Sequence, residues 1–305
     1  MAKSLHPERE TQNRIVKFFE KELGYKYLGN LGDEENFNIR WGDWKKFLSD
    51  SGYSAPFVES LQNEFFKTLS DFSKSPYHTN KEVYRILKYG LKLAEFPGEA
   101  PKTVYFINWE EPEKNNFYIA EEVTVNGNVE KRPDIVLYIN GIAIAVMELK
   151  KSTVSVADGI RQNVTNQREQ FIQRFFSTIQ ICVAANDSEG LRYGTSGTTE
   201  KYYLEWKEDN FTDQLQDKDD LDKILEGKCS KQLNLLEQQC YRIFQKERLL
   251  DIIHNFIIFD SGIKKICRYN QFYAIKRCEK RLSRNQGGIV WHTQGSGKSF
   301  SMVFY

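Results

Sequence analysis

The middle of the chain reads RPDIVLYINGIAIAVMELK over residues 132–150, two apolar runs joined by Asn140-Gly141. Asn-Gly is typical of a two-residue hairpin turn, so the runs are predicted to be neighbouring antiparallel strands. The second run, residues 142–147, is apolar at successive positions, which is typical of a strand buried on both faces. We therefore expect a central hairpin that carries charged residues at one end.

The register of this hairpin determines whether its two carboxylates meet. Glu148 and Lys150 share one face of the strand, with Cα atoms roughly 7 Å apart. A regular turn at Asn140-Gly141 pairs Glu148 with Pro133, so a one-residue bulge is needed to bring Asp134 opposite Glu148. A bulge or bend in this hairpin is therefore required for the two carboxylates to come together.

The charged residues at this strand end, Asp134, Glu148 and Lys150, support two interpretations. Carboxylate oxygens are ligands that Mg²⁺ prefers, and a neighbouring lysine can orient or activate the water that attacks a phosphodiester. Alternatively, they are exposed strand-end charges in which Glu148 and Lys150 form an ordinary salt bridge. The residues alone leave both interpretations open.

Hydrophobic periodicity outside the hairpin predicts a chain that alternates helices and strands. A helix is expected from residue 10 to 20, ending near Gly24, and residues 34–95 have a mainly helical pattern. Strands are expected at 103–107, 116–125, 133–138, 142–149 and 178–185, with a helix from 156 to 176 before the last of them. Asn126-Gly127 predicts a second hairpin turn.

The C-terminal end carries a phosphate-binding loop pattern. An apolar run at 288–291 precedes HTQGSGKS at 292–299, and this order predicts a buried strand, a loop and a helix that begins at Lys298. The loop residues that would bind nucleotide phosphates and Mg²⁺ are Gly295, Ser296, Gly297, Lys298 and Ser299. His292 departs from the glycine of the general pattern. Because the chain ends at Tyr305, we expect ATP binding without hydrolysis.

Composition sets outer limits on the class of protein. A chain of 305 residues with 40% hydrophobic and 28% charged residues is expected to fold around a large core. No apolar run approaches ~18 residues and the N-terminus lacks a signal peptide pattern, so a cytoplasmic protein without membrane contact is expected. Five cysteines without a C-x-x-C pair are interpreted as reduced.

Net charge of +1 gives no support for nucleic-acid binding, but the local charge is uneven. Residues 264–284 contain eight basic residues and the single acid Glu279, whereas residues 205–226 contain nine acids and three lysines. The basic segment is either a solvated helix face or a DNA or phosphate contact. The acidic segment is interpreted as a solvated face.

These motifs together resemble a known family. Pro133-Asp134 with Glu148-Leu149-Lys150 is similar to the metal site of PD-(D/E)xK nucleases, and the whole chain resembles the N-terminal part of the restriction subunit of type I restriction-modification enzymes. The resemblance also rests on Glu10-Thr11-Gln12, residues 160–163, 186–187, 190–195, 200–202, 206–209 and 265–271, and the phosphate loop.

The resemblance implies a type I site-specific deoxyribonuclease, which translocates double-stranded DNA with ATP and cuts it in a complex with methylation and specificity subunits. Asp134 and Glu148 would hold Mg²⁺, and Lys150 would assist catalysis. Gln162 matches the Gln of a Q-x-x-x-Y element with a DNA-contact role, but Asn166 stands at the Tyr position.

Two further residues are matched to the family by position alone. Gln271 lies where superfamily 2 motors place a Gln that hydrogen-bonds adenine. Glu10 resembles a first-helix acid that supports the metal in related nucleases, although a first-turn charge role on the helix is the preferred interpretation.

We therefore expect an α/β protein with a restriction-endonuclease-like mixed sheet flanked by helices, followed by the beginning of a RecA-like lobe. The expected divisions are a nuclease domain at 1–235, a helical linker at 236–262 and a truncated motor lobe at 263–305. Two other hypotheses remain. The chain could belong to a DNA-dependent ATPase or helicase whose N-terminal domain only binds DNA or partner subunits, or to a non-enzymatic scaffold.

Overall fold

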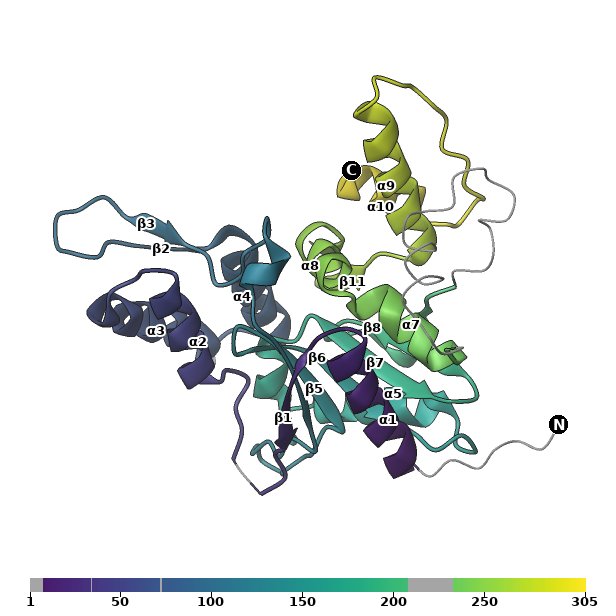
Figure 1. The fold of residues 1–305 in the computed structure, drawn as a ribbon, viewed down its shortest axis with the longest axis horizontal. Helices are drawn as coiled ribbons and strands as arrows, with labels where there is room; N and C mark the ends of the chain where they lie inside the picture. Colours follow the sequence, from purple (N-terminus) through teal and green to yellow (C-terminus); the bar gives the residue numbers. More distant parts are fainter. Residues whose placement is uncertain (1–7, 34, 72, 208–232) are drawn as a thin grey trace.

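The computed structural model describes residues 8–33, 35–71, 73–207 and 233–305. Most of the acidic segment, and Cys229, lie outside the described residues. The other four cysteines are free thiols, as expected. In the described parts of the chain, helices surround one large mixed sheet (Figure 1).

The sheet has seven strands, and the predicted hairpin lies at its centre. In spatial order the strands are β1 (Lys26–Asn30), β4 (Phe117–Glu121), β5 (Ile135–Ile139), β6 (Ile142–Leu149), β7 (Ile181–Asn186), β8 (Gly190–Gly194) and β9 (Leu204–Glu205). The β1–β4 and β6–β7 pairs are parallel, and the other pairs are antiparallel. All eight residues of β6 are buried, which confirms the prediction of a central strand.

The bulge required to bring the carboxylates together is present in the β5–β6 hairpin. Near the turn Ile139 pairs with Ile142 and Tyr138 with Ala143, but farther along Leu137 pairs with Ala145 and Ile135 with Met147. Ile144 is the extra residue, and it packs in the same hydrophobic core as Ala145. The ladder beyond the bulge is therefore shifted by one residue, so Asp134 lies opposite Glu148.

The two Asn-Gly dipeptides differ in the structure. Asn140 and Gly141 have φ of 50° and 82° and close the β5–β6 hairpin directly, as predicted. Between β4 and β5 the ladder instead ends at Glu121–Ile135, and a longer connection contains an isolated bridge between Val125 and Lys131. Gly127 packs against the backbone of Phe171, where a Cβ atom would lie 2.2 Å from its oxygen.

Helices cover both faces of the sheet. The helices α1 (Glu8–Lys21), α7 (Leu235–Phe244) and α8 (Lys246–Asn255) share one core with Ile135, Met147 and Leu149. On the opposite face, α5 (Val156–Asn166) and the 3₁₀ turn η2 (Gln173–Ser177) pack over alternate strand residues such as Val146 and Ala184. The predicted mixed sheet flanked by helices is therefore confirmed.

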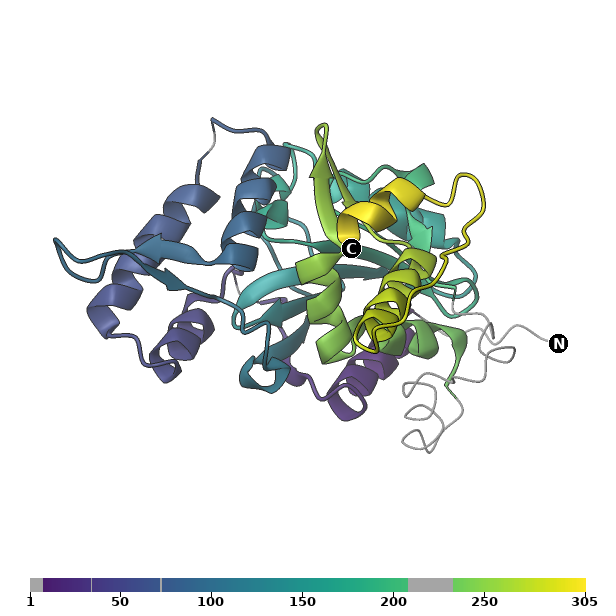
Figure 2. The same cartoon turned by 90° about the horizontal axis from the view of Figure 1, so that it is seen from above.

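A lateral group of helices lies beside the sheet, away from α9 in both views (Figures 1 and 2). It comprises α2 (Trp41–Asp50), α3 (Ala55–Leu69) and α4 (Pro76–Tyr89), with the small hairpin of β2 (Leu91–Leu93) and β3 (Lys102–Val104). The prediction of a mainly helical segment is confirmed. Strands β1, β8 and β9 were not predicted, since each is short or partly exposed.

Two predicted elements differ from the structure, since one helix is shorter than expected and one strand is absent from the described residues. The helix expected over 156–176 ends at Asn166, because the amide of Ile172 donates to the Asn166 carbonyl and turns the chain into η2. The strand expected over 288–291 is not formed, and Ile289 and Trp291 are 92% and 88% exposed. These four residues have no neighbouring strand among the described residues, so nothing satisfies their backbone as a sheet would.

The C-terminal part begins within the main core. After α8, strands β10 (Ile257–Asp260) and β11 (Ile263–Ile266) form a separate hairpin, followed by α9 (Tyr269–Leu282) and α10 (Lys298–Phe304). Phe256, Cys267 and Phe272 belong to the same hydrophobic cluster as the central sheet. The predicted division at 262/263 falls in the β10–β11 turn.

Candidate active site

The two predicted carboxylates meet at the end of the central hairpin. Asp134 immediately precedes β5 and Glu148 lies in β6, and the shifted register puts them opposite each other on the α5 face of the sheet. The backbone amide of Leu149 donates to Asp134 Oδ2 at 2.6 Å, which holds this carboxylate against β6. Lys150 follows on the same face, so the structure brings all three predicted residues together.

Both carboxylates are buried: Asp134 is 9% exposed and Glu148 is 0% exposed. Burial raises the pKa of Asp134 to about 6, opposed by the Leu149 amide and by the positive charge of Lys150. Burial raises the pKa of Glu148 well above its usual range, and the negative charge of Asp134 raises it further. A cation between the two groups would offset both effects.

Glu148 is the side chain that most needs such a cation. Its Oε1 accepts a hydrogen bond from Asn166 Nδ2 at 3.2 Å, whereas its buried Oε2 has no hydrogen-bond partner among the described residues. Those residues contain no group of three or more His, Cys, Asp or Glu arranged to hold a metal. Two carboxylates suit Mg²⁺, which keeps several of its waters, better than a metal that needs a full protein cage.

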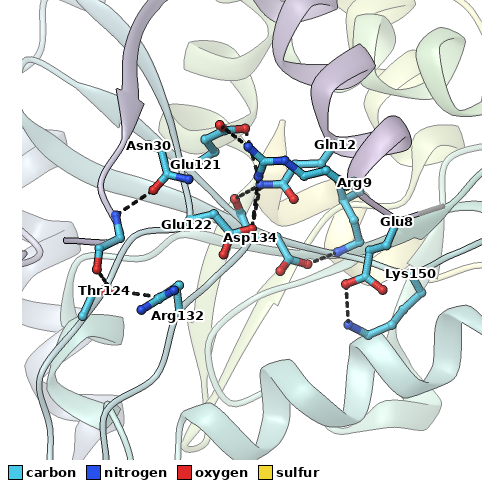
Figure 3. Close-up of polar contacts among 12 residues, drawn as sticks. Glu8, Arg9, Gln12, Asn30, Glu121, Glu122, Thr124, Arg132, Asp134 and Lys150 are labelled. Atoms are coloured by element: carbon cyan, nitrogen blue, oxygen red, sulfur yellow. Dashed lines mark hydrogen bonds and ion pairs between the residues drawn. The ribbon is translucent and has the colours of Figure 1, made fainter. Parts of the chain in front are cut away.

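The start of α1 lies at the entrance to this site (Figure 3). Glu8 Oε1 is 3.8 Å from Lys150 Nζ, and the Lys150 side chain is only 14% exposed. Glu8 and Glu10 are both acids in the first turn of α1, which agrees with the preferred interpretation of Glu10 as a first-turn charge. Of the two, it is Glu8 that contacts Lys150. The negative charge of Glu8 also raises the pKa of Asp134 and Glu148.

A polar network beside Asp134 was not predicted (Figure 3). Gln12 Nε2 donates to the Asp134 carbonyl at 3.2 Å and to Glu122 Oε1 at 3.1 Å. Arg9 contacts Glu121 Oε1 at 2.9 Å, and Tyr27 donates to the same oxygen. The sequence signals for it are the adjacent acids Glu121-Glu122, inside the strand predicted over 116–125, and Gln12 of the Glu10-Thr11-Gln12 motif.

Helix α5 brings the Q-x-x-x-Y-like element to the site. Gln162 is half-buried, and Asn166, one turn later, contacts Glu148 directly. The residue at the family's Tyr position therefore lies against a candidate metal ligand. Any DNA contact by Gln162 stays a prediction.

The phosphate loop contains the predicted residues on an exposed turn before α10. Gly295 and Gly297 have φ of 79° and 83°, and α10 begins at Lys298 as predicted. Lys298 Nζ donates to the carbonyls of His292 and Thr293 at 3.1 and 3.2 Å. Ser296 lies in this turn and Ser299 in the first turn of α10, and the two lysine contacts close the loop on itself.

Gln271 reaches this loop from α9. Its Nε2 donates to the Gly297 carbonyl at 2.9 Å, its Oε1 accepts from the Arg268 amide, and the residue is 3% exposed. The side chain thus joins α9 to the phosphate loop. The predicted adenine contact has no counterpart in these hydrogen bonds and stays a prediction.

The basic segment is less available than its sequence suggests. Lys264 is buried and donates to Asn80 Oδ1, the Ile179 carbonyl and Gln180 Oε1, and burial lowers its pKa well below the usual range. Lys265 pairs with Asp260, and Lys276 pairs with Asp251. Lys264, Lys265 and Lys276 are therefore engaged in contacts within the protein, and a DNA-contact role is not supported for these three residues.

Comparison with known families assigns the chain to a class. The family described as "Type I restriction enzyme R protein N terminus" matches residues 5–201, more than half of the chain. The chain belongs to this family, so the resemblance inferred from the motifs is confirmed. A second match, to the SWI2/SNF2 ATPase family, covers residues 270–305.

Individual relatives carry the corresponding names. A Methanocaldococcus jannaschii protein, provisionally named as the type I restriction enzyme MjaIXP endonuclease subunit, is 28% identical over 100% of this chain and 31% of its own length. The type I restriction enzyme HindI endonuclease subunit of Haemophilus influenzae is also 28% identical, over 74% of this chain and 22% of its own length. The chain thus spans less than a third of the length of each of these relatives.

None of the helices among the described residues is both long and apolar enough to cross a membrane.

Proposed function

We propose that this chain is the Mg²⁺-dependent endonuclease region of an ATP-dependent type I restriction subunit that hydrolyses phosphodiester bonds in double-stranded DNA. The observation that carries the proposal is the pairing of Asp134 with Glu148 across the bulged hairpin, with Lys150 on the same face. Membership of the restriction-subunit family supports it.

Each site residue has a distinct proposed role. Asp134 and Glu148 would hold Mg²⁺, because the buried Glu148 Oε2 lacks any other partner in the described chain. When bound, Mg²⁺ would polarise a phosphoryl oxygen and lower the pKa of a coordinated water. Lys150, nearly buried beside both carboxylates, would orient the attacking water or stabilise the negative charge on the phosphate.

The C-terminal segment is proposed to begin a RecA-like motor lobe that binds ATP. The match of residues 270–305 to an ATPase family supports this role, as does the start of α10 at Lys298. In this proposal Lys298 exchanges its two carbonyl contacts for nucleotide phosphates. DNA translocation and assembly with methylation and specificity subunits are proposed for the longer protein.

The test is plasmid cleavage by the full-length subunit assembled with its partner subunits, with Mg²⁺ and with or without ATP. Asp134→Ala should abolish cleavage while ATP hydrolysis continues, since the residue lies outside the phosphate loop. Lys298→Ala should stop ATP hydrolysis and, with it, ATP-dependent cleavage.

Two results would contradict the proposal in different ways. If Asp134→Ala cuts as fast as the wild type, the carboxylate pair is structural and the DNA-dependent ATPase alternative replaces the nuclease. If cleavage is equally fast without ATP and in Lys298→Ala, the site is a nuclease that does not depend on the motor.

A further inference from the structure

One face of α5 packs unusually closely on the strands that carry the site. Gly159, Asn163 and Asn166 are spaced by four and three residues, so they lie along a single side of the helix. A Cβ atom at Gly159 would be 3.1 Å from Ala184 Cβ and 3.4 Å from the Glu148 carbonyl. The absence of a side chain there lets the helix approach β6 and β7.

The two asparagines on this face use their amides differently. Asn163 is fully buried and its Nδ2 donates to the Val183 carbonyl at 2.7 Å, a contact with the β7 backbone. Asn166 is 2% exposed, and its Nδ2 donates to Glu148 Oε1 at 3.2 Å. Only the second contact reaches the candidate active site, and it comes from the last residue of α5.

An ionised carboxylate can only accept hydrogen bonds, so the amide group is matched to the charged form of Glu148. The bond occupies Oε1 and leaves the buried Oε2 as the oxygen without a partner in the described chain. Partners of metal-ligating carboxylates act in this way, by fixing the orientation of the ligand.

We propose that Asn166 is a positioning residue that holds the Glu148 carboxylate rotated so that Oε2 faces the metal. The inference rests on the proposed Mg²⁺ site at Asp134 and Glu148. It assigns Asn166 a structural link to the metal ligand, in place of the DNA contact associated with the Tyr of the related element.

The experiment is a titration of the 305-residue chain with Mn²⁺ between pH 5.5 and 8.5, in which electron paramagnetic resonance monitors Mn²⁺ binding. Asn166→Ala should weaken Mn²⁺ binding about 10- to 100-fold, which is typical when a partner of a metal ligand is removed. Asn166→Leu, which keeps the number of side-chain heavy atoms but removes the amide, should weaken Mn²⁺ binding to a similar degree.

Asn163→Ala is the matched control, since it removes a buried amide from the same helix face without touching Glu148. It should lower thermal stability but leave the Mn²⁺ affinity unchanged. Equal shifts in Asn163→Ala and the Asn166 variants, or no shift in the Asn166 variants, would overturn the positioning role.

Glu148→Gln separates this inference from the proposed function. If Glu148→Gln leaves Mn²⁺ binding intact, the metal site itself is wrong. If Glu148→Gln abolishes binding while Asn166→Leu behaves like Asn163→Ala, the metal site stands and only the role of Asn166 fails.

Discussion

At the scale of single residues, the site buries two carboxylates in surroundings that disfavour their charged forms. Asp134 and Glu148 are buried opposite each other, and the negative charge of Asp134 raises the cost of ionising Glu148. Such an arrangement sacrifices stability for binding, as is common at active sites. The effect of this burial on the free energy of unfolding can be measured in the protein without metal.

Asp134→Asn should therefore stabilise the fold in EDTA. The pKa of Asp134 rises from 3.8 to about 6 on folding, so between these values the folded state binds more protons than the unfolded state and the free energy of unfolding falls as pH rises. At pH 7.5 the substitution should remove a penalty of about 2–3 kcal/mol, and its benefit should shrink as pH falls from 7 to 4.

Urea unfolding at several pH values checks this prediction. Asp33→Asn, at an exposed carboxylate, should leave the free energy of unfolding within about 0.5 kcal/mol of the wild type. If Asp134→Asn makes the protein less stable than the wild type at pH 7.5, or gives a benefit that does not depend on pH, desolvation of Asp134 is not the cause.

At the scale of elements, the β5–β6 hairpin fixes the register that aligns the carboxylates. Gly141 has φ of 82°, and a Cβ atom there would lie 2.6 Å from the Arg40 carbonyl and 2.8 Å from the Trp44 amide nitrogen. The turn is therefore packed against the start of α2. The bulge at Ile144 supplies the one-residue shift in register that places Asp134 opposite Glu148.

Gly141→Ala should destabilise the protein by about 2–4 kcal/mol, because it adds left-handed strain to a clash with backbone atoms that cannot rotate away. Gly52→Ala is a suitable control, since Gly52 has φ of 90° but nothing within 4 Å of a new Cβ atom, and it should cost only about 1–2 kcal/mol. Thermal unfolding of the two variants compares them. Equal losses would mean that packing against α2 contributes little.

At the scale of the whole molecule, helices α7 and α8 belong to the core that packs on the central sheet. Tyr25 donates to the Phe244 carbonyl, Tyr84 to the Ile253 carbonyl and Tyr193 to the Cys267 carbonyl. Each bond joins the C-terminal segment to an element more than seventy residues earlier. A helical linker between independent domains would not be expected to have such contacts.

Leu249→Ala should therefore weaken the central sheet. Leu249 is fully buried in α8 and lies in the cluster that contains Met147 and Leu149, so the cavity should cost about 2–5 kcal/mol. Hydrogen exchange of the β6 amides should accelerate accordingly. Leu282→Ala, at a position 61% exposed, is the control, and unchanged β6 exchange in Leu249→Ala would mean that α8 unfolds separately from the sheet.

The central hairpin and the buried β6 could be predicted from residues 132–150, which also showed that a bulge was needed for Asp134 to lie opposite Glu148. The association of Asp134, Glu148 and Lys150 followed from the family resemblance. Turn chemistry and alternation along a strand act over a few residues, so local sequence contains the information. The start of α10 at Lys298 and the first helix followed in the same way.

The remaining features depend on contacts between distant parts of the chain. Gln12 bonds to the Asp134 carbonyl across 122 residues, and Asn166 meets Glu148 because α5 packs against β6 and β7. The apolar run at 288–291 has the composition of a strand but lacks neighbouring strands in the described chain, and a strand needs partners for its backbone. Local pattern thus specifies which side chains form the site, whereas packing of helices onto the sheet specifies how those side chains are held.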